Sequence, residues 1–145
     1  GLARLRQETS IRIAGGEMNR RWHDFWEMDT LGSLDVYQPD VVLAGGITGV
    51  KKISDRVQKN DAWFSPHTWG NGIGLLANLH LACAVSKCPY LEFPFDPPVW
   101  NNERRDYILC PEDRLMIDQD GYLHVPQKAG LGCELDEKAL APYLI

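Results

Sequence analysis

The chain has 145 residues, of which 44% are hydrophobic, and its formal net charge at pH 7 is −5. This length fits one domain or a piece of a larger protein. No segment approaches the roughly 20 apolar residues that a membrane span needs. The negative charge, without a Lys/Arg cluster, argues against general nucleic-acid binding.

Cysteine spacing and the N-terminus bear on the protein's location. Cys83, Cys88, Cys110 and Cys133 stand at irregular intervals without CxxC pairs, which favours free thiols and a cytoplasmic protein. The first segment, "GLARLRQETS", lacks the shape of a signal peptide and an initiator Met. We therefore expect the chain to begin in the middle of a longer protein.

The first hundred residues alternate between strand and helix patterns. Residues 11–16, "IRIAGG", predict a strand, and residues 19–32 predict a helix. On one face of that helix we expect Trp22, Phe25, Trp26 and Asp29. Residues 34–42 predict the next strand and residues 46–61 the next helix. Its expected buried side chains are Ile47, Val50, Ile53 and Val57.

The alternation continues to residue 95. Residues 62–67, "AWFSPH", predict a strand, and residues 71–87 predict an apolar, Ala-rich helix that should be well buried. Residues 90–95, "YLEFPF", predict a fourth strand. Strands that alternate with helices at this pitch indicate βα units around a parallel sheet.

The tail, residues 101–145, has a different character. Residues 116–125, "MIDQDGYLHV", predict a hairpin with Asp120 and Gly121 at its turn. The segment "LDEKAL", residues 135–140, predicts a short helix. Because the tail contains no low-complexity linker, we expect it to pack against another part of the protein.

An ionisable residue stands at the end of each expected strand. These residues are Glu17, Asp40, His67 and Glu92, at intervals of 23, 27 and 25 residues, each close to one βα unit. In a (β/α) barrel the carboxyl ends of the strands meet at one mouth, where active sites form. We therefore expect the four side chains to line one cavity.

Each of the four also has a purely structural interpretation: a turn acid for Glu17, a helix cap for Asp40, a core histidine for His67 and an ion-pair partner for Glu92. Together they suit acid/base chemistry. Glu17 could bind a hard cation such as Mg²⁺. Asp40 could orient His67 as a general base or acid, and Glu92 could bind a developing oxyanion if it keeps its proton.

Several motifs carry a resemblance to a known family: "IAGGE", "QPDVVLAGGIT", "SPHTWGNGIGLLANLHLA", "YLEFPFDPP" and "GLGCELDE". They resemble the C-terminal barrel half of the mandelate racemase/muconate lactonizing enzyme family, in the mandelate racemase subgroup of the enolase superfamily. The resemblance implies that Glu17 is one of three carboxylate ligands of an essential Mg²⁺. It also implies that Asp40 and His67 form an acid/base dyad, while Glu92 hydrogen-bonds the substrate carboxylate.

The resemblance implies an α/β fold in two parts. Residues 1–100 would form the C-terminal half of an enolase-type (β/α) barrel, with about four parallel βα units. Residues 101–145 would form a tail that packs on an absent capping domain. Because a full barrel needs about 250 residues, the expected partner is the missing N-terminal half, and the complete enzyme is expected to be a homo-oligomer.

The resemblance further implies a reaction in which a proton is taken from the carbon next to a carboxylate, through an enediolate. We expect an acid-sugar dehydratase that acts on a small carboxylate, with Mg²⁺ and with neither nucleic acid nor membrane as a partner. Alternatives are a racemase, epimerase or cycloisomerase with the same dyad, and a catalytically silent half-barrel. Trp69 would either wall off the substrate or serve in packing.

Overall fold

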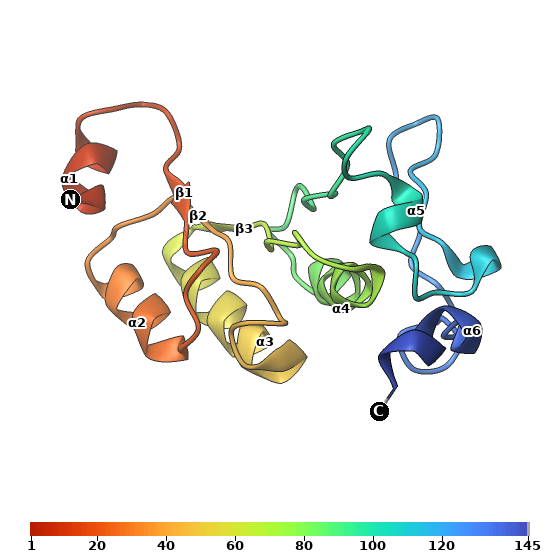
Figure 1. The fold of residues 1–145 in the computed structure, drawn as a ribbon. Coiled ribbons are helices and arrows are strands. Elements are labelled where there is room, and N and C mark those ends of the chain that lie inside the picture. The colour runs from red at the N-terminus through yellow and green to blue at the C-terminus, as the bar shows by residue number, and fades with distance from the viewer. Residues whose placement is uncertain (145) are drawn as a thin grey trace.

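The computed structural model describes residues 1–144, in which a short parallel sheet lies beside its helices (Figure 1). The strands β1 (Ala14–Gly15), β2 (Val36–Tyr37) and β3 (Trp63–Phe64) are neighbours in that order. Val36 pairs in parallel with Ala14 on one side and with Trp63 on the other. The α/β class with a parallel sheet is therefore confirmed.

A helix follows each strand, as the alternating patterns predicted. The three helices are α2 (Trp22–Thr30), α3 (Gly46–Val57) and α4 (Gly72–Cys83), and a short 3-10 turn (Gln58–Asn60) extends α3. Figure 1 shows α2 and α3 side by side on one side of the strands. A further helix, α1 (Leu2–Gln7), precedes the sheet and was not predicted.

The prediction of a strand over residues 90–95 was wrong, because the described chain forms no paired strand there. The adjoining segment still runs beside β3: Lys87 O accepts from the Phe64 N–H at 2.9 Å, and Tyr90 O accepts from Ser65 Oγ at 3.1 Å. Proline lacks the N–H that a ladder needs, and Pro94 lies inside the segment. The paired strands in residues 1–144 number three, where about four were expected.

The first core cluster lies between the sheet and helices α2 and α3. Phe25, Ile53, Val57 and Phe64 are fully buried in it, which confirms most of the predicted helix faces. Ile47 was wrongly predicted to lie on the buried side of its helix, and Trp22, expected on one face with Phe25, does not share the burial of Phe25. Both stand in the first turn of their helices and are 42% and 46% exposed. The helical period identifies a face but does not show how far along the helix that face stays covered.

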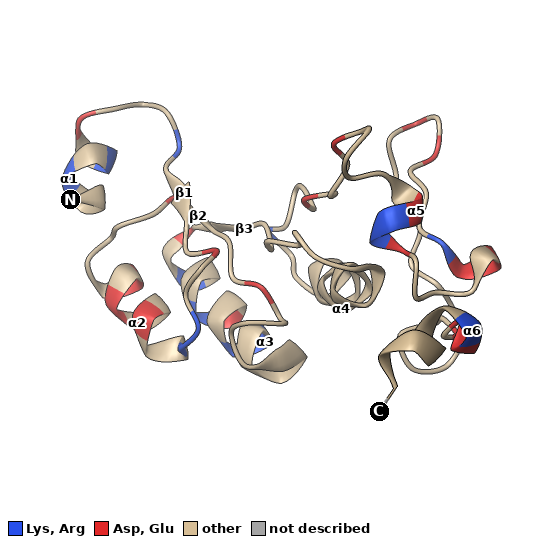
Figure 2. Cartoon of the chain, in the orientation of Figure 1, with Lys and Arg blue, Asp and Glu red and all other residues tan. Residues whose placement is uncertain are grey.

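Helix α4 joins the sheet to the tail. Leu81 belongs to the first cluster, whereas a second cluster holds Leu75, Leu76 and Leu79 against the tail residues Ile108, Leu109 and Leu115. Figure 2 shows α4 free of Lys, Arg, Asp and Glu along its whole length. The prediction that α4 is well buried is confirmed. Within residues 1–144, no helix is long and apolar enough to cross a membrane.

The tail contains short elements connected by loops. They are α5 (Asn102–Arg105), α6 (Glu137–Leu140) and 3-10 turns at Pro111–Asp113 and Ala141–Tyr143. The predicted hairpin is confirmed, since Ile117 bridges Leu123 in antiparallel fashion and Gly121 has φ +87° at the turn. The tail thus packs on α4, and its contact with a capping domain stays a prediction.

A fully buried ion pair ties the tail to the segment that carries Glu92. Arg105 and Asp106 are both 0% exposed, with Arg105 Nη2 and Asp106 Oδ2 2.6 Å apart. Arg105 also donates to Pro94 O at 3.3 Å and to Leu115 O at 2.6 Å, while Asp106 Oδ2 accepts from the Leu115 N–H. The pair therefore links three segments of the chain.

We predict that removal of one partner destabilises the protein more than removal of both. Arg105→Met leaves the Asp106 carboxylate buried without its counter-charge, which should lower the free energy of unfolding by about 3–5 kcal/mol. The double variant Arg105→Met/Asp106→Leu removes both charges and should lose less. Urea unfolding of the full-length variants measures both values, and a double variant less stable than the single one would contradict the prediction.

Candidate active site

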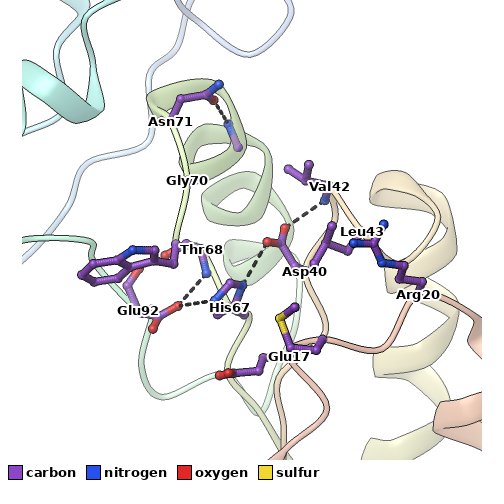
Figure 3. A pocket seen from close by; sticks show the side chains of 13 residues that line it. Glu17, Arg20, Asp40, Val42, Leu43, His67, Thr68, Gly70, Asn71 and Glu92 are labelled. Atoms are coloured by element: carbon purple, nitrogen blue, oxygen red, sulfur yellow. Dashed lines mark hydrogen bonds and ion pairs between the residues drawn. The ribbon is translucent and has the colours of Figure 1, made fainter. Parts of the chain in front are cut away.

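A cavity of about 630 Å³ opens beyond the carboxyl ends of the strands (Figure 3). All five residues singled out from the sequence line it: Glu17, Asp40, His67, Trp69 and Glu92. Four of them follow β1, β2 or β3, since His67 and Trp69 share the loop after β3, and Glu92 comes from the unpaired segment beside β3. The structure therefore brings the predicted set together at one place.

Glu17 reaches the cavity because of the glycine before it. Gly16 has φ +99°, in the left-handed region that favours glycine. A Cβ there would lie 2.8 Å from Cε1 of the buried Phe25. The turn therefore combines a left-handed backbone with close packing on α2, and Glu17 follows it as an exposed residue at the cavity.

Asp40 contacts both the turn after β2 and His67, but it is not a helix cap, because the N-cap of α3 is Gly45. Its Oδ1 accepts from the Val42 N–H at 2.9 Å, a bond to the backbone two residues on that closes a local turn. Its Oδ2 lies 3.1 Å from Nδ1 of His67. Asp40 is only 5% exposed, so its carboxylate is held between the turn after β2 and the histidine after β3.

His67 points its second ring nitrogen toward Glu92 (Figure 3). An ionised carboxylate only accepts hydrogen bonds, so the contact with Asp40 places a proton on Nδ1 of the ring. In the neutral ring, Nε2 is then an acceptor, and it lies 4.0 Å from Oε2 of Glu92. The arrangement leaves one basic nitrogen between the two acidic residues.

Glu92 forms two hydrogen bonds with the loop that carries His67. Its Oε2 accepts from the Thr68 N–H at 2.7 Å, and its backbone oxygen accepts from Thr68 Oγ1 at 2.5 Å. Thr68 is almost fully buried. These two bonds hold the segment around Glu92 against β3 in the absence of a strand ladder.

Trp69 both packs and borders the cavity. Its ring stacks on Trp100, with centroids 6.1 Å apart and planes 21° apart. It is nevertheless 48% exposed and lines the cavity beside His67. Its surface therefore forms an aromatic rim, which can cover an apolar face of a bound molecule.

Sequence reasoning missed Arg20, Thr68 and Asn78. Arg20 and Thr68 line the cavity, whereas Asn78 lies behind it, where its Nδ2 donates to Oδ1 of Asp40 at 2.9 Å. Asn78 had a sequence signal, since it is an amide in the apolar run "LLANLHLA". A buried polar group in such a run needs hydrogen-bond partners.

The donor set fits Mg²⁺ only in part. Glu17 offers the oxygen ligand that this cation prefers. Within residues 1–144, no group of three or more His, Cys, Asp and Glu side chains is placed to hold a metal ion. A complete coordination shell would therefore need donors beyond those of the described chain.

Solved structures resemble this fold closely. A mandelate racemase/muconate lactonizing enzyme-like protein from Rubrobacter xylanophilus is 30% identical to this chain, with a TM-score of 0.81. The match covers 97% of this chain and 34% of that protein's chain. The 3,6-anhydro-D-galactonate cycloisomerase from Zobellia galactanivorans is 34% identical, with a TM-score of 0.82. That match covers 98% of this chain and 38% of the cycloisomerase chain. These likenesses confirm the barrel-type fold inferred from the motifs.

Curated relatives match nearly the whole chain. An arabinonate dehydratase from Saccharolobus solfataricus is 32% identical over 141 residues, and a D-galactarolactone cycloisomerase from Agrobacterium fabrum is 28% identical over 145. The chain spans only 36% and 38% of their lengths. The family profile described as "Enolase C-terminal domain-like" matches residues 1–139. The chain belongs to the enolase C-terminal domain-like family.

Proposed function

We propose that this chain supplies the acid/base side of an enzyme that removes the proton next to the carboxylate of a sugar acid. The observation that carries the proposal is the Asp40–His67 pair, whose free Nε2 faces the cavity opposite Glu92. The relatives support the substrate class, because they are named as sugar-acid dehydratases and as cycloisomerases of a sugar lactone or an anhydro sugar acid.

His67 is the proposed base. Its Nε2 takes the proton from the α-carbon, and the bonding electrons move into the carboxylate, giving an enediolate. Asp40 accepts the Nδ1–H bond and stabilises the imidazolium that forms. General base catalysis of this kind contributes about 10²–10⁴-fold in rate. Glu92 would hydrogen-bond the substrate carboxylate as its charge grows.

For dehydration, the protonated His67 has a second task. The enediolate electrons form a carbon–carbon double bond as the hydroxyl on the neighbouring carbon leaves, and the Nε2 proton departs with it as water. The resulting enol becomes a 2-keto acid.

Cycloisomerisation is the alternative, supported by two relatives with that name. In either reaction, the Trp69 side chain would cover one side of the bound substrate.

The cofactor and partners are part of the same proposal. Glu17 would contribute one carboxylate ligand to Mg²⁺, which when bound would offset negative charge on the substrate carboxylate. The remaining ligands would come from an N-terminal half with a capping domain, in a cytoplasmic homo-oligomer. Without those parts, the 145-residue chain would be catalytically silent.

We predict that His67→Asn in the full-length enzyme lowers kcat by at least about 10²-fold, since the base is lost. Far-ultraviolet circular dichroism should be unchanged. The matched control is His124→Asn, because His124 pairs with Asp118 in the exposed hairpin and should keep normal turnover. Near-normal rates for His67→Asn would remove His67 from the mechanism.

We predict that the full-length enzyme converts at least one acid sugar to a 2-keto acid. A panel of aldonates, aldarates and their lactones in deuterium oxide, followed by NMR, reports keto product and exchange of the α-proton. Exchange without keto acid would contradict dehydration and favour racemisation. Consumption of a lactone without formation of a keto acid would identify a cycloisomerase.

Glu17→Gln should weaken the binding of Mg²⁺ to the full-length enzyme, because the neutral amide is a poorer ligand than carboxylate for a hard cation. Isothermal titration with MgCl₂ measures the affinity directly. Glu112→Gln, which changes an exposed carboxylate in the tail, is the control. Equal affinity in wild type and Glu17→Gln would exclude Glu17 as a ligand.

A further inference from the structure

Asn78 is a fully buried amide in the middle of the apolar helix α4. Its Oδ1 accepts from the Val41 N–H at 3.2 Å. Since a backbone N–H can only donate, this contact fixes which end of the amide is oxygen. The Nδ2 end then faces Asp40, donating to its Oδ1 at 2.9 Å, and also donates to Gly74 O at 3.1 Å.

These bonds give the two oxygens of the Asp40 carboxylate different partners. Oδ1 receives two donors, the Asn78 amide and the Val42 N–H. Oδ2 receives the His67 Nδ1–H. With Oδ1 held from two directions, rotation of the carboxylate about its last torsion would break both bonds, so Oδ2 stays aimed at the imidazole.

We propose that Asn78 is a positioning residue that orients Asp40, and through it keeps the proton of His67 on Nδ1 and leaves Nε2 free toward the cavity. The effect on turnover rests on the function proposed above, whereas the effect on the imidazole proton rests on the hydrogen bonds alone. Asn78 does not line the cavity, so it acts through Asp40 without touching a substrate.

The other charged groups near the dyad do not replace this constraint. Glu92 lies 4.0 Å from His67 on the opposite ring nitrogen. Glu17 and Arg20 line the same cavity, and among the described residues neither forms a hydrogen bond to Asp40. On the buried side of the Asp40 carboxylate, the side-chain hydrogen bond to Oδ1 comes from the Asn78 amide.

The test uses the full-length enzyme and the variant Asn78→Leu, which removes the amide at similar size. Nitrogen-15 NMR of histidine, without substrate and with His67→Asn to assign the signal, reports which ring nitrogen holds the proton. The wild type should hold it on Nδ1, and Asn78→Leu should show a mixture of tautomers. The kcat should fall about 10- to 100-fold, as for other outer partners of active-site groups, with KM unchanged.

Leu79→Ala is the matched control. It opens a core cavity on the same helix, in the cluster that faces the tail, so it should lower stability without changing the tautomer. Asn78→Ser is the second variant in case Asn78→Leu does not fold. Its shorter hydroxyl can bond to Gly74 O as helical serines do, while the bond to Asp40 is lost, so it should show the same tautomer mixture.

A double-mutant cycle separates positioning from general packing. In an Asp40→Ala background, Asn78→Leu should cause little further loss of kcat, because its effect passes through Asp40. Equal losses in both backgrounds, or an unchanged Nδ1 tautomer in both Asn78 variants, would overturn the inference. If the wild type turned over no sugar acid, the proposed function would fail, but the tautomer measurement would still decide the role of Asn78.

Discussion

The parallel register between the three strands is the constraint on which the candidate site depends. Val36 lies opposite both Ala14 and Trp63, so the turns after the strands leave the sheet at the same edge. Asp40 and His67 are 27 residues apart in sequence yet form a hydrogen bond of 3.1 Å. A shift of one residue would turn alternate side chains to the opposite face and would separate this pair.

Asp40 shows how one side chain can be both structural and chemical. A carboxylate that accepts from a backbone N–H in a local turn uses one oxygen for that bond, which leaves the other available. In this chain, Oδ1 meets the Val42 N–H and the Asn78 amide, and Oδ2 meets His67. The local turn therefore supports the orientation of the dyad, and the structural and chemical contacts of Asp40 belong to one network.

Helix α4 links the dyad to the tail. One of its faces holds Asn78 against the turn after β2, and another packs Leu75 and Leu79 against tail residues. The buried pair of Arg105 and Asp106 then ties the tail to Pro94, two residues beyond Glu92. The position of Glu92 thus depends on tail packing and on Thr68 rather than on a paired strand.

The amino-acid sequence by itself determined the alternation of strands and helices and the polar residues after each strand, because these features repeat at the pitch of a βα unit. It also indicated that α4 is buried, since that segment is apolar and rich in alanine. Only the tertiary structure decided where burial ends along a helix, as Ile47 and Trp22 show. It also decided that residues 90–95 form no paired strand and that Asn78 contacts Asp40. Both depend on contacts between segments far apart in the sequence, and a local sequence pattern does not show which distant segments lie close in space.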